Sequence, residues 1–174
     1  MLMLSFDVRA LAVHAVAVDG GLQVDDETWL PADAKPDSTL RVSGRLSVAG
    51  NGRYYFSGRF DGAVTLECRR CLTPVVVPVA EEVTAVFFDV SGADPDGSDD
   101  PDVYALAEAG KKVDLRPALR EQWLLNVPSF ALCRDDCRGI CPTCGADLNA
   151  GTCSCVPASN RRFNALRAMR SPAD

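Results

Sequence analysis

The chain of 174 residues contains a single histidine, His14, and this scarcity removes several classes of function. A serine–histidine–aspartate triad needs a histidine as its base. His14 lies in AVHAVAV, a stretch typical of a strand rather than of a ligand site. No pair of carboxylates stands out from the acidic background, and there is no glycine-rich phosphate loop and no internal repeat. We find no catalytic constellation and expect a protein that is not an enzyme.

Long apolar runs and an excess of positive charge are also missing. No apolar run approaches the roughly 18–20 residues that a membrane helix needs. The apolar start of the chain is interrupted by Asp7 and Arg9 and lacks the cationic beginning of a signal peptide. The 18 Lys and Arg against 24 Asp and Glu give a net charge of −6, which does not fit a generic nucleic-acid binder. We therefore expect a cytoplasmic protein whose thiols stay reduced and which does not enter a membrane.

Alternation of apolar and polar residues predicts a sheet in the first half of the chain. Four segments have the pattern or composition of strands: 4–13, 40–50, 54–68 and 71–90. Residues 51–53, Asn-Gly-Arg, are a hairpin turn signal, whereas residues 19–39 are rich in Asp, Gly and Pro and are expected to form a loop. The sequence therefore predicts an antiparallel sheet with the pair Cys68 and Cys71 at the tip between two strands.

One helix is predicted after the sheet. From Asp114 the apolar residues Leu115, Leu119 and Trp123 recur at helical spacing, and Asp114 is a candidate N-cap. Asn126 and the proline two residues later are expected to end the helix. Its apolar face is expected to pack on the sheet, which gives an α+β fold.

Composition also predicts how the chain is divided. Residues 91–102 hold five Asp, two Gly and two Pro, and we expect an acidic linker there. Residues 1–132 are predicted to form a β-rich domain with the helix, within which 1–39 have no assigned role. Residues 133–174 are predicted to form a cysteine-rich, zinc-binding tail with a short helix from about residue 159.

The eight cysteines fall into four close pairs. These are Cys68 and Cys71, Cys133 and Cys137, Cys141 and Cys144, and Cys153 and Cys155. Zinc takes four thiolates in a tetrahedron, and one C-x2-C turn supplies half of such a site. In CPTCG the glycine after the second cysteine allows the sharp turn that points N–H groups at sulfur. The pairs therefore predict two zinc ions bound by all eight cysteines, with flanking arginines that offset the thiolate charge: Arg69, Arg70, Arg134 and Arg138.

Several readings of the cysteines stay open. The favoured pairing is the simplest one, which puts residues 141, 144, 153 and 155 in one site and residues 68, 71, 133 and 137 in the other. The competing pairing joins residues 133, 137, 141 and 144 and leaves 68, 71, 153 and 155. A single site with four free cysteines is a third arrangement. CPTC could also be a thiol–disulfide pair, but a loop follows it where a redox motif has a helix, so zinc is favoured over redox, disulfide or iron–sulfur chemistry.

The combined motifs resemble the YceD family, which is named for accumulation of large-subunit ribosomal RNA. The resemblance runs from about residue 40 to the end. It rests on these positions: Cys68, Arg69, Cys71, Leu72, Cys133, Cys137, Gly139, Cys141, Pro142, Cys144, Gly145, Leu148, Asn149, Cys153 and Cys155.

The resemblance implies a non-enzymatic accessory factor in ribosome biogenesis. Such a factor would promote accumulation or processing of 23S rRNA, with large-subunit rRNA or ribosomal proteins as partners and no small-molecule substrate. Two other classes of function remain beside it: a thiol-redox sensor that uses the C-x-x-C pairs, and a zinc-dependent protein-interaction adaptor.

Overall fold

The computed structural model describes residues 4–12, 14–88 and 103–156. The chain divides into two compact units. Unit 1 comprises Met1–Leu66 and Val75–Ser129, and unit 2 comprises Glu67–Pro74 and Phe130–Asp174. The predicted acidic linker at 91–102 and the predicted helix from residue 159 lie outside the described residues.

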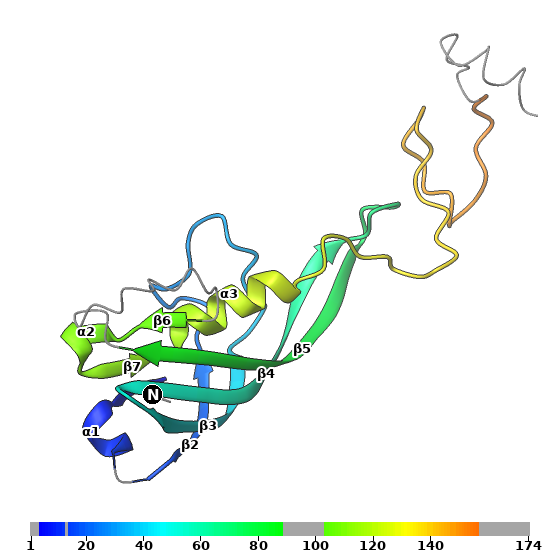
Figure 1. The fold of residues 1–174 in the computed structure, drawn as a ribbon. Coiled ribbons are helices and arrows are strands. Elements are labelled where there is room, and N and C mark those ends of the chain that lie inside the picture. The colour runs from blue at the N-terminus through cyan, green and yellow to red at the C-terminus, as the bar shows by residue number, and fades with distance from the viewer. Residues whose placement is uncertain (1–3, 13, 89–102, 157–174) are drawn as a thin grey trace, which may run out of the picture. The chain divides into compact units, whose positions relative to one another are not determined.

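Unit 1 is built on a five-stranded sheet of order β2-β3-β4-β5-β6 (Figure 1). Its strands are β2 (Val16–Leu22), β3 (Leu40–Gly50), β4 (Arg53–Glu67), β5 (Pro74–Phe88) and β6 (Val103–Ala105). The pairs β2–β3 and β3–β4 are antiparallel, whereas β5 and β6 run parallel. A separate antiparallel pair joins β1 (Ser5–Asp7) to β7 (Lys112–Asp114). The mainly antiparallel sheet predicted from the alternation is confirmed.

The helices described are α1 (Val8–Leu11), α2 (Ala107–Gly110) and α3 (Arg116–Asn126). Only α3 is longer than one turn. It begins with a proline in its first turn and ends where the N–H of Val127 donates to the Trp123 carbonyl at 3.0 Å. The N-cap is Leu115 rather than the predicted Asp114, whose carboxylate instead accepts from the Arg116 N–H at 3.1 Å. None of the helices in the described part of the chain has the length and apolarity that crossing a bilayer requires.

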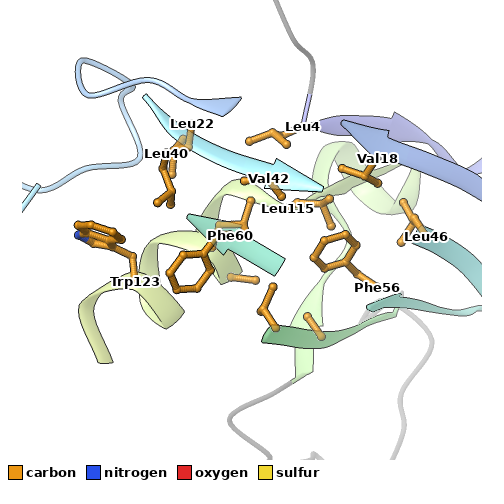
Figure 2. Close-up of a cluster of buried hydrophobic side chains, with 14 of the residues drawn as sticks. Leu4, Val18, Leu22, Leu40, Val42, Leu46, Phe56, Phe60, Leu115 and Trp123 are labelled. Atoms are coloured by element: carbon orange, nitrogen blue, oxygen red, sulfur yellow. The ribbon is translucent and has the colours of Figure 1, made fainter. Parts of the chain in front are cut away.

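The apolar face of α3 completes the core against the sheet. Figure 2 shows Trp123 of α3 beside Phe60 of β4. Their rings meet edge to face with 6.1 Å between centroids, and the indole N–H donates to the Ala34 carbonyl at 2.7 Å. A Cβ on Gly62 would lie 3.0 Å from the Trp123 ring and 2.9 Å from Leu40, so only glycine leaves room for the indole. The predicted packing of the helix on the sheet is confirmed.

The N-terminal part of the chain departs from the prediction. Residues 4–13 were expected to form one strand, but β1 stops at Asp7 and α1 follows. The Asp7 carboxylate accepts from the Arg9 N–H at 2.8 Å, and this N-cap turns the chain into a helix. The loop expected from residue 19 starts only after Leu22, because β2 pairs with β3 up to Leu22↔Leu40. His14 lies exposed before β2 instead of within a strand.

The segment between β2 and β3 is tied to α3 by the ion pairs of two arginines, Arg116 and Arg120. The Arg120 guanidinium donates two hydrogen bonds, of 2.6 and 2.8 Å, to the Asp33 carboxylate. The Asp33 side chain is only 8% exposed. Arg116 binds Asp114 at 2.7 Å and Asp26 at 3.3 Å. Such paired, partly buried charges hold a segment that has no secondary structure of its own.

Acid is expected to weaken unit 1 through Asp33. The hydrogen bond from Arg120 holds the pKa of Asp33 below its ordinary value of 3.8. Its stabilising contribution is therefore complete above that value and is lost as the pH falls through the lower pKa of the folded protein. We expect Asp33→Asn to cost on the order of 1–2 kcal/mol at neutral pH. Urea unfolding of both proteins from pH 7 to pH 3 checks this, since the cost should shrink as the pH falls, and a cost independent of pH would contradict it.

Candidate metal centres

The first cluster of cysteines in unit 2 brings together residues far apart in sequence. Cys68 and Cys71 lie between β4 and β5, and Cys133 and Cys137 follow α3 along the chain. All four Sγ atoms lie within 4.8 Å of one another. The Sγ atoms of Cys68 and Cys137 are 3.9 Å apart, and those of Cys71 and Cys133 are 3.6 Å apart. Four sulfurs arranged tetrahedrally at about 2.3 Å from one zinc ion would be about 3.8 Å apart.

Backbone contacts position these thiols. The N–H of Arg69 donates to the Ala131 carbonyl at 2.9 Å, which joins the loop after β4 to the segment that begins at Phe130. Within the loop, the N–H of Leu72 donates to the Cys68 carbonyl at 2.9 Å. The N–H of Cys133 points at the Cys68 sulfur at 3.4 Å. The segment that carries Cys133 therefore supplies a donor to the Cys68 sulfur, so the two halves of the cluster position each other.

Hydrogen bonds favour the thiolate form of two cysteines in the first cluster, Cys68 and Cys71. N–H groups of Cys133 and Cys71 lower the pKa of Cys68 to about 6. The hydroxyl and N–H of Thr73 lower the pKa of Cys71. The pKa of Cys133 is raised to about 12 because it shares a hydrogen bond with Cys137 and is desolvated. Close sulfurs cannot all ionise without a cation between them, which is the electrostatic setting of a metal site.

The second cluster is formed within a short stretch of chain. The Sγ atoms of Cys141, Cys144, Cys153 and Cys155 lie within 4.8 Å of one another. The N–H of Gly145 closes a turn on the Cys141 carbonyl at 2.9 Å, with Gly145 at φ +74°. N–H groups of Cys144 and Thr143 lower the pKa of Cys141 to about 6, whereas the shared hydrogen bond with Cys144 raises the pKa of Cys155 to about 12. The glycine therefore has the role in the turn that CPTCG predicts.

All eight predicted ligands are in these two clusters, and all eight are free thiols. The grouping is the simplest pairing, with residues 68, 71, 133 and 137 together and residues 141, 144, 153 and 155 together. The competing pairing is not the one found. Sulfur separations of 3.6–3.9 Å are far from the roughly 2.05 Å of a disulfide bond.

The flanking arginines make specific contacts within unit 2. The Arg70 guanidinium donates to the carbonyls of Cys137 at 2.8 Å and Asp135 at 3.0 Å. The Arg69 guanidinium lies over the ring of Phe130, 5.0 Å from its centroid. Arg70 thus anchors backbone beside the first cluster, whereas the sequence suggested only a general offset of thiolate charge.

Asn149 was missed as a site residue, although it stands in the family motif. Its Nδ2 donates to the Cys137 sulfur at 3.5 Å, and its Oδ1 accepts from the Arg138 N–H and from Arg134, both at 2.8 Å. The only signal in the sequence is its place in GADLN, which does not reveal that the side chain reaches back to Cys137.

Two glycines with nearly the same backbone angle give a matched pair of variants. Gly139 has φ +75°, and a Cβ there would lie 2.8 Å from the Arg70 carbonyl oxygen, whereas Gly145 has φ +74° and open space. Alanine costs roughly 1–2 kcal/mol at such an angle at either position. Gly139→Ala must also push away the carbonyl that accepts from the Ile140 N–H at 3.0 Å.

We therefore expect faster hydrogen exchange across residues 67–74 in Gly139→Ala than in Gly145→Ala. Exchange measured by mass spectrometry on both purified variants checks this difference. Equal exchange in that peptide would show that the contact between Gly139 and Arg70 does not order the loop.

Comparison with known proteins assigns the chain to a family. A family model described as "Large ribosomal RNA subunit accumulation protein YceD" matches residues 56–170, a range that includes all eight cysteines. The chain belongs to the YceD family. The resemblance drawn from the sequence motifs is therefore confirmed.

Individual YceD relatives are distant. The chain is 28% identical to a Zea mays protein named "Large ribosomal RNA subunit accumulation protein YCED homolog 1, chloroplastic", over 78% of this chain and 55% of the maize protein. It is 32% identical to an uncharacterized protein of Mycobacterium bovis, over 47% of this chain and 39% of that protein. It is 25% identical to the uncharacterized protein YlbN of Bacillus subtilis, over 82% of this chain and 80% of that protein.

The matched part of the chain thus spans about half or less of the maize and mycobacterial proteins. No solved structure matches the chain at a significant level.

Proposed function

We propose that the two cysteine clusters each bind one zinc ion and that both ions are structural, holding distant parts of the chain together. Four thiolates in a tetrahedron are a donor set for zinc or for iron–sulfur centres. The sulfur separations of 3.6 and 3.9 Å in the first cluster fit four thiolates on one ion. In a multi-iron cluster the four thiolates are divided among two or four irons, so that some or all of the sulfurs would lie farther apart than they do on one ion.

Metal content is the direct test of this part of the proposal. Protein purified under reducing conditions is expected to carry about two zinc ions per chain by elemental analysis. The variant Cys144→Ser with Cys155→Ser should carry one, and Ser154→Ala, which leaves every cysteine in place, should carry two. Wild-type protein with no metal and freely titratable thiols would instead support a thiol-redox sensor.

We further propose that the protein is a non-enzymatic cytoplasmic factor that promotes accumulation or processing of large-subunit ribosomal RNA. The family match over residues 56–170 carries this proposal, because the family is described by that role. In support, the clusters use all eight cysteines as candidate ligands. The net charge of −6 argues against tight non-specific RNA binding and suits a limited RNA feature or a basic ribosomal protein as partner.

The cellular test compares ribosomal RNA in cells with and without the protein. Loss of the protein should lower the ratio of 23S to 16S rRNA, and the wild-type gene or Ser154→Ala should restore it. Cys144→Ser with Cys155→Ser should not restore it. An unchanged ratio would contradict the proposal. Crosslinking then separates two modes of action, because copurified ribosomal proteins without an rRNA crosslink would indicate a protein-interaction adaptor.

A further inference from the structure

A link of only three residues separates the two clusters. Cys137 is a ligand of the first cluster and Cys141 is a ligand of the second, so residues 138–140 belong to neither. On one side, the N–H of Ile140 donates to the Arg70 carbonyl at 3.0 Å, within the loop that holds Cys68 and Cys71. The link is therefore bonded directly to the loop that supplies half of the first cluster.

The same link is bonded on its other side to the turn at 147–149. The Gly139 carbonyl accepts from the Leu148 N–H at 2.9 Å, and Ile140 forms an isolated bridge with Asp147. This turn lies between Cys144 and Cys153, so the chain around it is closed when the four thiols of the second cluster are held together. When the second cluster is ordered, the turn at 147–149 is held in place, and its hydrogen bonds in turn hold residues 138–140.

The Asn149 side chain in this turn donates a hydrogen bond to a sulfur of the first cluster. Its Oδ1 accepts from the Arg138 N–H in the link, and its Nδ2 donates to the Cys137 sulfur at 3.5 Å. A further bond from Nδ2 to the Asp147 carboxylate at 2.8 Å fixes which way the amide faces. The amide oxygen thus faces a donor and the amide nitrogen faces acceptors, one of which is the sulfur of a proposed ligand in the first cluster.

We propose that Asn149 is a positioning residue that couples the two metal centres, so that metal in the Cys141 cluster raises the affinity of the Cys68 cluster. This inference rests on the proposed binding of metal. Metal in the second cluster closes the chain around 147–149 and holds the Asn149 amide beside Cys137. There its N–H stabilises the negative sulfur that the first metal requires. Because coupling free energy is reciprocal, metal in the first cluster raises the affinity of the second by the same factor.

The coupling is measured on the full chain with Co²⁺, whose bonds to thiolate sulfur absorb in the near ultraviolet. Three proteins are titrated against a competing chelator: the intact chain, Cys144→Ser with Cys155→Ser, and Cys71→Ser with Cys133→Ser. The coupling factor is the overall two-metal association constant of the intact chain divided by the product of the two single-cluster constants. We expect a factor on the order of tenfold, within the usual range of coupling between sites.

Each of the three proteins is then made again with Asn149→Ala, with Asn149→Asp, and with Asn51→Asp as the matched control. Asn51 lies exposed in the turn after β3 in unit 1 and tests the same chemical change away from both clusters. We expect Asn149→Ala to bring the factor to within about twofold of one, and Asn51→Asp to leave it unchanged. Asn149→Asp should lower it at least as far as alanine does, because a carboxylate then faces the Cys137 sulfur.

Fluorescence of the two tryptophans, Trp29 and Trp123, confirms in every variant that unit 1 is folded. A coupling factor near one in the intact chain, or a factor unchanged by Asn149→Ala, overturns the proposed coupling. The proposal that both clusters bind metal still stands in that case if two Co²⁺ ions are bound. A chain that binds no Co²⁺ overturns both.

Discussion

Removal of both metal ions by a chelator is expected to unfold unit 2 and to leave unit 1 folded. Every residue of the buried apolar cluster lies in unit 1. Among the described residues of unit 2, the buried apolar ones are Cys68, Ala131, Cys137 and Cys141. All of these except Ala131 are themselves proposed metal ligands. We therefore expect a unit with so little apolar surface to bury to depend on the proposed metal bonds for its folding free energy.

The two units can be followed separately in one sample. Hydrogen exchange by mass spectrometry should rise by orders of magnitude across residues 130–156 after chelation and stay unchanged across β3 and β4 as far as Leu66. The emission of Trp29 and Trp123, both buried in unit 1, should not change. A chelator already saturated with zinc serves as the control. Protection of residues 130–156 that survives complete metal removal would show that these residues hold their fold without the ions.

Single ligand variants refine the same expectation. Cys141→Ser is expected to unfold residues 137–156 while the sheet stays folded, because Cys141 is the buried one of the four proposed ligands in the second cluster. Cys68→Ser is expected to loosen the loop after β4 and its bonds to residues 131 and 133. Proteolysis that cuts both variants in the same places would contradict a two-site arrangement.

The ligands could be predicted from the sequence because they fall into close cysteine pairs, each of which supplies half of a site. Four close cysteine pairs divide into two four-thiolate sites without remainder, and the pair Cys68 and Cys71 falls in a turn between two strands whose alternation is plain. The grouping found in the structure is the one that the simplest pairing predicts, and the structure decides it against the competing pairing. Cys137 and Cys141 are only four positions apart and belong to different clusters.

The predictions that failed depend on contacts outside the segment in question. Asp7 caps a helix inside a stretch whose composition is that of a strand. The Asp- and Gly-rich residues Asp19–Leu22 form strand because β3 supplies their hydrogen bonds. Asn149 is a residue type common in turns, and nothing in the order of residues shows that its amide reaches a sulfur twelve positions earlier.

The α3 face, by contrast, follows from spacing alone, and its largest residue, Trp123, should contribute most to the stability of unit 1. Trp123 is fully buried, meets Phe60 edge to face, and donates its indole N–H to the Ala34 carbonyl. Trp123→Ala is expected to cost about 3–5 kcal/mol, because it leaves a large cavity beside Gly62. It also removes the donor from a carbonyl in the segment between β2 and β3, which adds the cost of an unpaired polar group.

Two further variants separate packing from the hydrogen bond. Trp123→Phe keeps an aromatic ring near Phe60 but removes the donor to Ala34, so its cost should lie between those of wild type and alanine. Leu125→Ala, on the same helix with 70% of its surface exposed, should change stability by less than about 0.5 kcal/mol. Urea unfolding followed by far-ultraviolet circular dichroism measures all three without relying on the tryptophan signal. A cost below about 1 kcal/mol for Trp123→Ala would mean that the sheet does not depend on α3 for its core, since cavity formation at a fully buried tryptophan cannot otherwise be so small.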